Sequence, residues 1–129
     1  MPPEHRVVQT PAAPAAIGPY SQAVTSRGIV YVSGQIGIDP HTGVIPENFT
    51  AQARLVLANL RAILEAAGSS MGNVLSVDVY LVDMAKFSQF NEIYASAFES
   101  HRPARAVVGV RALPREAQVE VRCVATLVG

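Results

Sequence analysis

Charge, cysteine and tryptophan are all scarce in this chain of 129 residues. Only 16% of the residues are charged, tryptophan is absent and Cys123 is the single cysteine. One cysteine cannot form an internal disulfide, which fits a reducing compartment. Residues 1–20 lack the charged start and continuous apolar run of a signal peptide, and no later run approaches the ~20 apolar residues of a membrane span. We therefore expect a soluble, cytoplasmic protein that does not associate with membranes.

The charges also balance, with ten Lys and Arg against ten Asp and Glu. Such a chain has no field that would concentrate a polyanion, so nucleic acid is not an expected partner. The three histidines, His5, His41 and His101, lie without ligand spacing, and no metal site is expected. Because 50% of the residues are hydrophobic, part of the apolar surface should be covered by partner subunits.

The length predicts a single domain over residues 1–129, with residues 1–10 as a flexible segment or an edge strand. Residues 29–33, "IVYVS", are β-branched and aromatic and predict a strand that stops at Gly34. Alternation over residues 74–82 predicts another strand, with Leu75, Val77, Val79 and Leu81 on one face.

Two helices are predicted from apolar residues that recur with a period of 3.6. The first follows Asn48 as its N-cap and closes at Gly68; the second follows Asp83 and ends before Pro103. Residues 104–111 and 117–127 then read as a β-hairpin joined across "LPRE". This order favours an α+β fold with one mixed sheet and both helices packed on one face.

The predicted hairpin would place Arg105, Glu120 and Arg122 on the uncovered face of the sheet, and Cys123 on the helix-covered face. Arg105 is unusual because it stands where an apolar strand begins, in "RPARAVVGVRALP". A guanidinium at such a place needs an anion, and it binds a carboxylate with two parallel hydrogen bonds. The alternative is a structural ion pair.

Three separated segments, "IGPYSQAV" (17–24), "VSGQIG" (32–37) and "PAR" (103–105), resemble the Rid/YjgF family of reactive-intermediate deaminases. The resemblance implies a chorismate-mutase-like α+β subunit with about six strands and two helices, assembled as a homotrimer with ligand clefts between subunits. It also implies hydrolysis of enamines and imines, namely 2-aminoacrylate, 2-iminopropanoate and 2-iminobutanoate, to 2-keto acids and ammonia. No metal or organic cofactor is implied.

Matched position by position, Arg105 looks like the carboxylate-binding arginine of this family and Glu120 like the residue that holds the attacking water. Tyr20, Ser33 and Asn91 are similar to residues that line the same cleft, and a tyrosine hydroxyl can also pass protons. Simpler roles remain open for each. Glu120 can form an ion pair with Arg122, Tyr20 and Ser33 can satisfy loop backbone, and Asn91 can face solvent.

The chain departs from the typical family pattern at three positions near the expected cleft. Val107 stands where a cysteine is usual, Arg122 replaces a second glutamate, and Arg102 replaces an aromatic residue. The added cations favour a more acidic substrate or draw Glu120 into a salt bridge.

Two other functions compete with imine hydrolysis. A non-catalytic binder of small carboxylates or a chaperone-like trimer would need Arg105 but not Glu120. An endoribonuclease is less compatible with a neutral chain that has no basic stacking platform and no evident pair of catalytic histidines.

Overall fold

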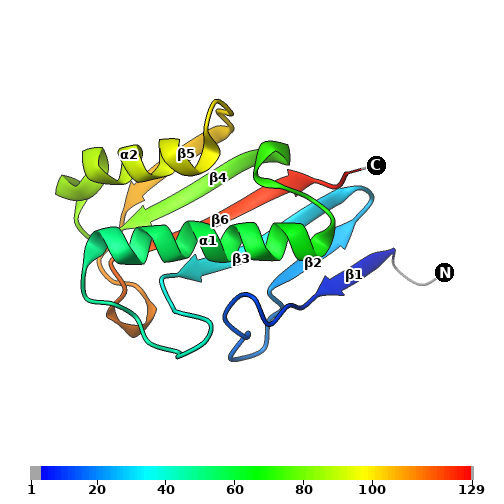
Figure 1. The fold of residues 1–129 in the computed structure, drawn as a ribbon, viewed down its shortest axis with the longest axis horizontal. Coiled ribbons are helices and arrows are strands. Elements are labelled where there is room, and N and C mark those ends of the chain that lie inside the picture. The colour runs from blue at the N-terminus through cyan, green and yellow to red at the C-terminus, as the bar shows by residue number, and fades with distance from the viewer. Residues whose placement is uncertain (1–3, 129) are drawn as a thin grey trace.

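The computed structural model describes residues 4–128 and contains one six-stranded sheet in the order β1-β2-β3-β6-β4-β5. Strands β4 and β5 are parallel, and the other neighbours are antiparallel. Both helices pack on the same face of the sheet, α1 in front of β3 and β6 and α2 beside β5 (Figure 1). The strands are β1 (His5–Val8), β2 (Ala23–Ser26), β3 (Ile29–Ile36), β4 (Val74–Leu81), β5 (Ala104–Gly109) and β6 (Val119–Thr126). The α+β fold with two helices on one face is confirmed, and β1 lies at one edge of the sheet.

Helix α1 (Phe49–Ala67) begins and ends where the sequence predicts. The Asn48 side chain accepts a hydrogen bond from the Ala51 amide at 3.0 Å, and Gly68 takes a left-handed φ of 89°. Asp83 caps a short 3-10 turn, Met84–Lys86, by accepting from the Ala85 amide. This turn continues directly into α2 (Phe87–Phe98), which ends before Pro103.

The predicted hairpin of the last two strands is wrong. Strand β5 pairs in parallel with β4, and β6 is inserted between β3 and β4. The physical reason is that β4, α2 and β5 form a strand–helix–strand crossover, the connection that joins parallel neighbours. The register sets Arg105 opposite Val77 and Val107 opposite Val79, so both residues share the helix-covered face. The predicted orientation of β6 is correct, but the predicted orientation of β5 is inverted.

Strand β4 also departs from simple alternation at its start. A register shift between Val74 and Ser76 turns Val74 into the core and leaves Leu75 50% exposed, contrary to prediction. Strand β3 likewise continues past the predicted stop at Gly34 to Ile36.

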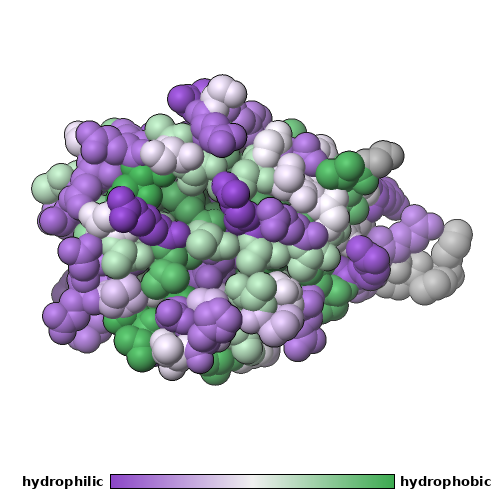
Figure 2. Space-filling view, in the orientation of Figure 1, coloured by the Kyte–Doolittle hydropathy of each residue, from purple (hydrophilic) through white to green (hydrophobic). Residues whose placement is uncertain are grey.

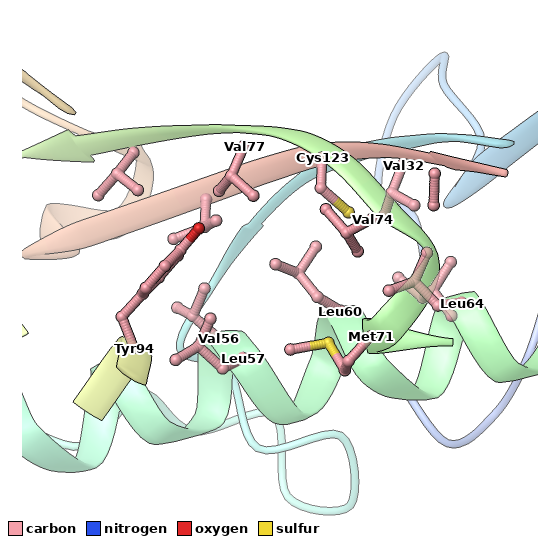
Figure 3. Close-up of a cluster of buried hydrophobic side chains, with 14 of the residues drawn as sticks. Val32, Val56, Leu57, Leu60, Leu64, Met71, Val74, Val77, Tyr94 and Cys123 are labelled. Atoms are coloured by element: carbon pink, nitrogen blue, oxygen red, sulfur yellow. The ribbon is translucent and has the colours of Figure 1, made fainter. Parts of the chain in front are cut away.

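The core lies between the sheet and α1, where Leu60 and Leu64 face Val32, Val74 and Cys123 (Figure 3). Burial raises the pKa of the Cys123 thiol to about 12, so the thiol stays protonated and acts as an apolar core group. Within residues 4–128, no helix has the length and hydrophobicity needed to cross a membrane.

A candidate active site in two halves

Arg105 forms one polar half-site together with α2. Its Nη1 donates a 2.8 Å hydrogen bond to Asn91 Oδ1, and its Cζ lies 4.7 Å from the centre of the Tyr94 ring and 5.8 Å from that of Phe87. The guanidinium is exposed and has no acidic partner among residues 4–128. The cation–π contacts with the two rings and the single hydrogen bond to Asn91 orient Arg105 without neutralising its charge. A structural ion pair with another residue in the range 4–128 is therefore not its role.

The three residues of α2 that contact Arg105 follow one another in the sequence at intervals of four and three positions. Phe87, Asn91 and Tyr94 therefore project from one side of the helix. Tyr94 points from α2 toward the sheet (Figure 3), and its buried hydroxyl has no hydrogen-bond partner among the described residues. A pocket of about 330 Å³ opens here. Its lining residues are Asn91, Tyr94, Ala95, Arg102, Pro103 and Arg105.

Glu120 forms the second half-site on the opposite face of the sheet. It lines a pocket of about 310 Å³ together with Ile17, Tyr20, Gly34 and Arg115. Partial burial raises the pKa of the Glu120 carboxyl. Arg122 pairs with Asp78 at 3.5 Å instead of with Glu120, so the Glu120–Arg122 ion pair considered from the sequence is not formed.

Gly34 explains how the Glu120 carboxylate reaches its position. The pairing of β3 with β6 shifts between Val32 and Gln35, which places an irregularity at Ser33 and Gly34. A Cβ on Gly34 would lie 2.6 Å from Glu120 Oε2. The absence of a side chain at Gly34 thus makes room for the carboxylate.

Tyr20 and Ser33 belong to the same region but differ in their contacts. Tyr20 is 53% exposed and lines the Glu120 pocket, where its hydroxyl accepts a 3.4 Å hydrogen bond from the Ile17 amide. The Ser33 hydroxyl instead donates a 2.6 Å bond to the Ser21 carbonyl. Ser33 therefore ties the loop that carries Tyr20 to β3.

The structure does not bring all of the predicted site residues together in one chain. Arg105 and Asn91 lie on the helix-covered side, level with Val77, whereas Glu120 lies level with Tyr80 on the uncovered side. The prediction that Arg105 and Glu120 share a face is wrong. Phe87 and Tyr94 were not among the predicted site residues, although their spacing from Asn91 places all three on one side of the predicted second helix.

Fold and known relatives agree on the class of protein. The topology is that of a chorismate-mutase-like α+β subunit, and the family model for endoribonuclease L-PSP matches residues 10–127. The 2-iminobutanoate/2-iminopropanoate deaminase of Mus musculus is 46% identical over 121 residues, covering 93% of this chain and 90% of the relative. An L-PSP protein of Entamoeba histolytica superimposes with a TM-score of 0.94 at 48% identity, covering 95% and 99% of the two chains. TdcF of Escherichia coli, solved with bound serine, gives 0.92 at 39% identity, covering 95% and 99%.

The chain belongs to the endoribonuclease L-PSP family, which is the Rid/YjgF family indicated by the three sequence segments.

Proposed function

We propose that this chain is an imine deaminase, a hydrolase that converts small 2-imino acids to 2-keto acids and ammonia. The observation that carries the proposal is Arg105, a guanidinium that lines an open pocket, is held by Asn91 and Tyr94, and lacks an acidic partner among residues 4–128. A planar cation prepared in this way suits the carboxylate shared by all 2-imino acids. The deaminase name of the mouse relative supports the same reaction.

In the proposed reaction, Arg105 holds the substrate carboxylate and Glu120 accepts a proton from a water molecule as that water attacks C2 of the imine. The resulting carbinolamine has one new C–O bond and an amino group that gains the proton. Transfer of the hydroxyl proton to the amino group then lets the C–N bond break, so that ammonia leaves and the C–O bond becomes the carbonyl of the 2-keto acid. Tyr20 is placed in the Glu120 pocket, where its hydroxyl passes protons between water and nitrogen.

We further propose a homotrimer whose clefts combine the Arg105 half-site of one subunit with the Glu120 half-site of the next. Two observations support this assembly. First, the two half-sites lie on opposite faces of a single chain. Second, the uncovered face exposes apolar side chains, including Tyr31 at 52% and Val108 at 47%. The helix-covered face carries hydrophilic and hydrophobic residues side by side (Figure 2). Covering the apolar face with a second subunit removes this area from water.

A mixture of two impaired variants tests the composite cleft. Trimers assembled from Arg105→Ala and Glu120→Gln subunits, refolded together, should be far more active than either variant alone. Each mixed trimer contains one cleft that has an intact arginine from one variant and an intact glutamate from the other. The rate of ammonia release should rise only after the subunits exchange. A mixture that forms mixed trimers by mass and stays inactive would contradict the composite cleft, as would a stable monomer in sedimentation equilibrium.

Gly34→Ala tests whether the position of the Glu120 carboxylate matters. The added methyl group must displace the Glu120 side chain, since it would lie 2.6 Å from Oε2. We expect hydrolysis to fall about 10- to 100-fold, because a misplacement of about 1 Å at a reacting group has effects of this size. Gly72→Ala is the matched control, since a Cβ there meets Ser70 Oγ at an ordinary 3.8 Å. Equal turnover in both variants would argue against a role for the Glu120 carboxylate.

A further inference from the structure

A second arginine, Arg102, lines the same pocket as Arg105. Its Nη1 donates to the carbonyl oxygens of Glu99 and His101, the latter at 3.0 Å. Both acceptors are neutral backbone groups at the end of α2, so they fix the guanidinium without cancelling its charge. The N–H groups on Nε and Nη2 have no hydrogen-bond partner in the part of the chain that the structure describes.

The pocket therefore carries two cations and no carboxylate among its lining residues. Neither Arg102 nor Arg105 makes an ion pair with any residue in the range 4–128. Both guanidinium charges also act on Tyr94. Burial raises the pKa of the Tyr94 hydroxyl above its ordinary value, and Arg105 and, to a smaller extent, Arg102 oppose this rise. A ligand with one carboxylate satisfies Arg105 and leaves the second guanidinium unpaired.

We propose that the pocket selects 2-imino acids that carry a second carboxylate, the 2-imino dicarboxylates of four or five carbons, with Arg105 binding the carboxylate next to the imine and Arg102 binding the distal one. This inference rests on the proposed imine hydrolysis. The physical reason is that a charge-assisted hydrogen bond from a fixed, unpaired guanidinium is gained only by a substrate that presents a second anion there. Specificity then comes from a contact that monocarboxylic imines cannot make.

A purely structural role for Arg102 makes a different prediction. If Arg102 serves only to hydrogen-bond the backbone carbonyl groups of Glu99 and His101 after α2, its replacement lowers thermal stability and affects the turnover of all substrates alike. A ratio of activities toward two substrates separates the roles, because any loss of folded protein cancels in the ratio.

The experiment measures kcat/KM for 2-iminopropanoate and for the two dicarboxylic imines, iminosuccinate and 2-iminoglutarate. Each is generated in place by oxidation of its parent amino acid, and spontaneous hydrolysis is subtracted. We expect the wild-type protein to prefer a dicarboxylic imine. In Arg102→Gln the dicarboxylic-to-monocarboxylic ratio should fall about 10- to 100-fold, the size of one charge-assisted hydrogen bond. Arg102→Lys should restore part of the ratio, because it keeps the charge but not the planar group.

Arg54→Gln provides the control for charge alone, since Arg54 is an exposed arginine on α1 outside both half-sites. It removes the same net charge and should leave the ratio as in the wild type. A wild-type preference for the monocarboxylic imine, or an unchanged ratio in Arg102→Gln, would overturn the inference.

Binding of stable 2-keto acids separates this inference from the proposed reaction. Titration calorimetry with oxaloacetate, 2-oxoglutarate and pyruvate should show tighter binding of the dicarboxylates, and Arg102→Gln should remove the difference. If the wild-type protein hydrolysed no imine yet showed this binding preference, the proposed reaction would fail and the pocket assignment would stand. If it hydrolysed imines and bound all keto acids equally, the pocket assignment would fail and the reaction would stand.

Discussion

Arg105→Lys is expected to lose most of the imine-hydrolysing activity even though the positive charge remains. A guanidinium offers a carboxylate two parallel hydrogen bonds, each worth ~1.5 to 3 kcal/mol when charged, and a lysine ammonium cannot reproduce the pair. The lysine would also lose the cation–π contact with the Tyr94 ring, whose centre lies 4.7 Å from Arg105 Cζ, and the hydrogen bond from Nη1 to Asn91. We expect a loss of about 10- to 100-fold for Arg105→Lys and a larger loss for Arg105→Ala.

The measurement is turnover of 2-aminoacrylate, generated in place by a dehydratase, together with thermal melting and the mass of the assembly. Fold and assembly should persist in both variants, because Arg105 is exposed on the edge strand β5 and the core is built by its neighbours. Arg54→Lys and Arg54→Ala, on the outer surface of α1, are matched controls and should be active. Turnover close to wild type in Arg105→Ala would refute the carboxylate role, and a collapsed assembly would assign Arg105 to structure.

Local physics made most of the secondary structure predictable from the sequence. Contacts within a few residues determine α1, namely the caps at Asn48 and Gly68 and the 3.6-residue apolar period. The predicted start and end of α1 are therefore correct. The partner of each strand is decided by contacts far apart in the chain. Alternation in residues 104–111 and 117–127 gave no information on whether the two strands pair with each other or with β4. The preceding helix was the usable signal, since a strand–helix–strand unit favours parallel pairing.

That single error in pairing also changed the predicted site. The types of the key residues, Arg105 and Glu120, followed from sequence motifs, but their placement on one face came from the assumed hairpin. Because the pairing with β4 reverses the predicted orientation of β5, Arg105 faces α2 and contacts the Tyr94 ring. Glu120 lies on the opposite face of the sheet. The irregularity at Ser33 and Gly34 was not predictable from alternation, because such shifts depend on the partner strand.

The environment of Glu120 links activity to stability with a definite sign. Burial raises the pKa of this carboxyl above its ordinary value of 4.5, which means that folding favours the protonated form. The cost of holding the ionised carboxylate is therefore present at pH values above the raised pKa and disappears below the ordinary one. Glu120→Gln removes this cost, so at neutral pH its melting temperature should equal or exceed that of the wild type.

Glu120→Gln should nevertheless hydrolyse imines far more slowly, by ~100- to 10,000-fold if Glu120 is the general base. The amide keeps the size of the side chain beside Gly34 but cannot accept the proton of the attacking water. In the wild type, kcat/KM should fall as the pH decreases through the raised pKa of Glu120, and this acidic limb should be absent from the residual activity of the variant.

Binding of pyruvate should persist in Glu120→Gln, because the carboxylate is held by Arg105 in the other half-site. Glu65→Gln on the helix surface is the matched control and should keep both the rate and the acidic limb. Normal hydrolysis by Glu120→Gln would mean that other groups hold the attacking water. Loss of pyruvate binding in Arg105→Ala, in a protein with no measurable imine hydrolysis, would instead favour a non-catalytic carboxylate binder. The pair of variants therefore decides between an enzyme that needs both half-sites and a binder that needs only Arg105.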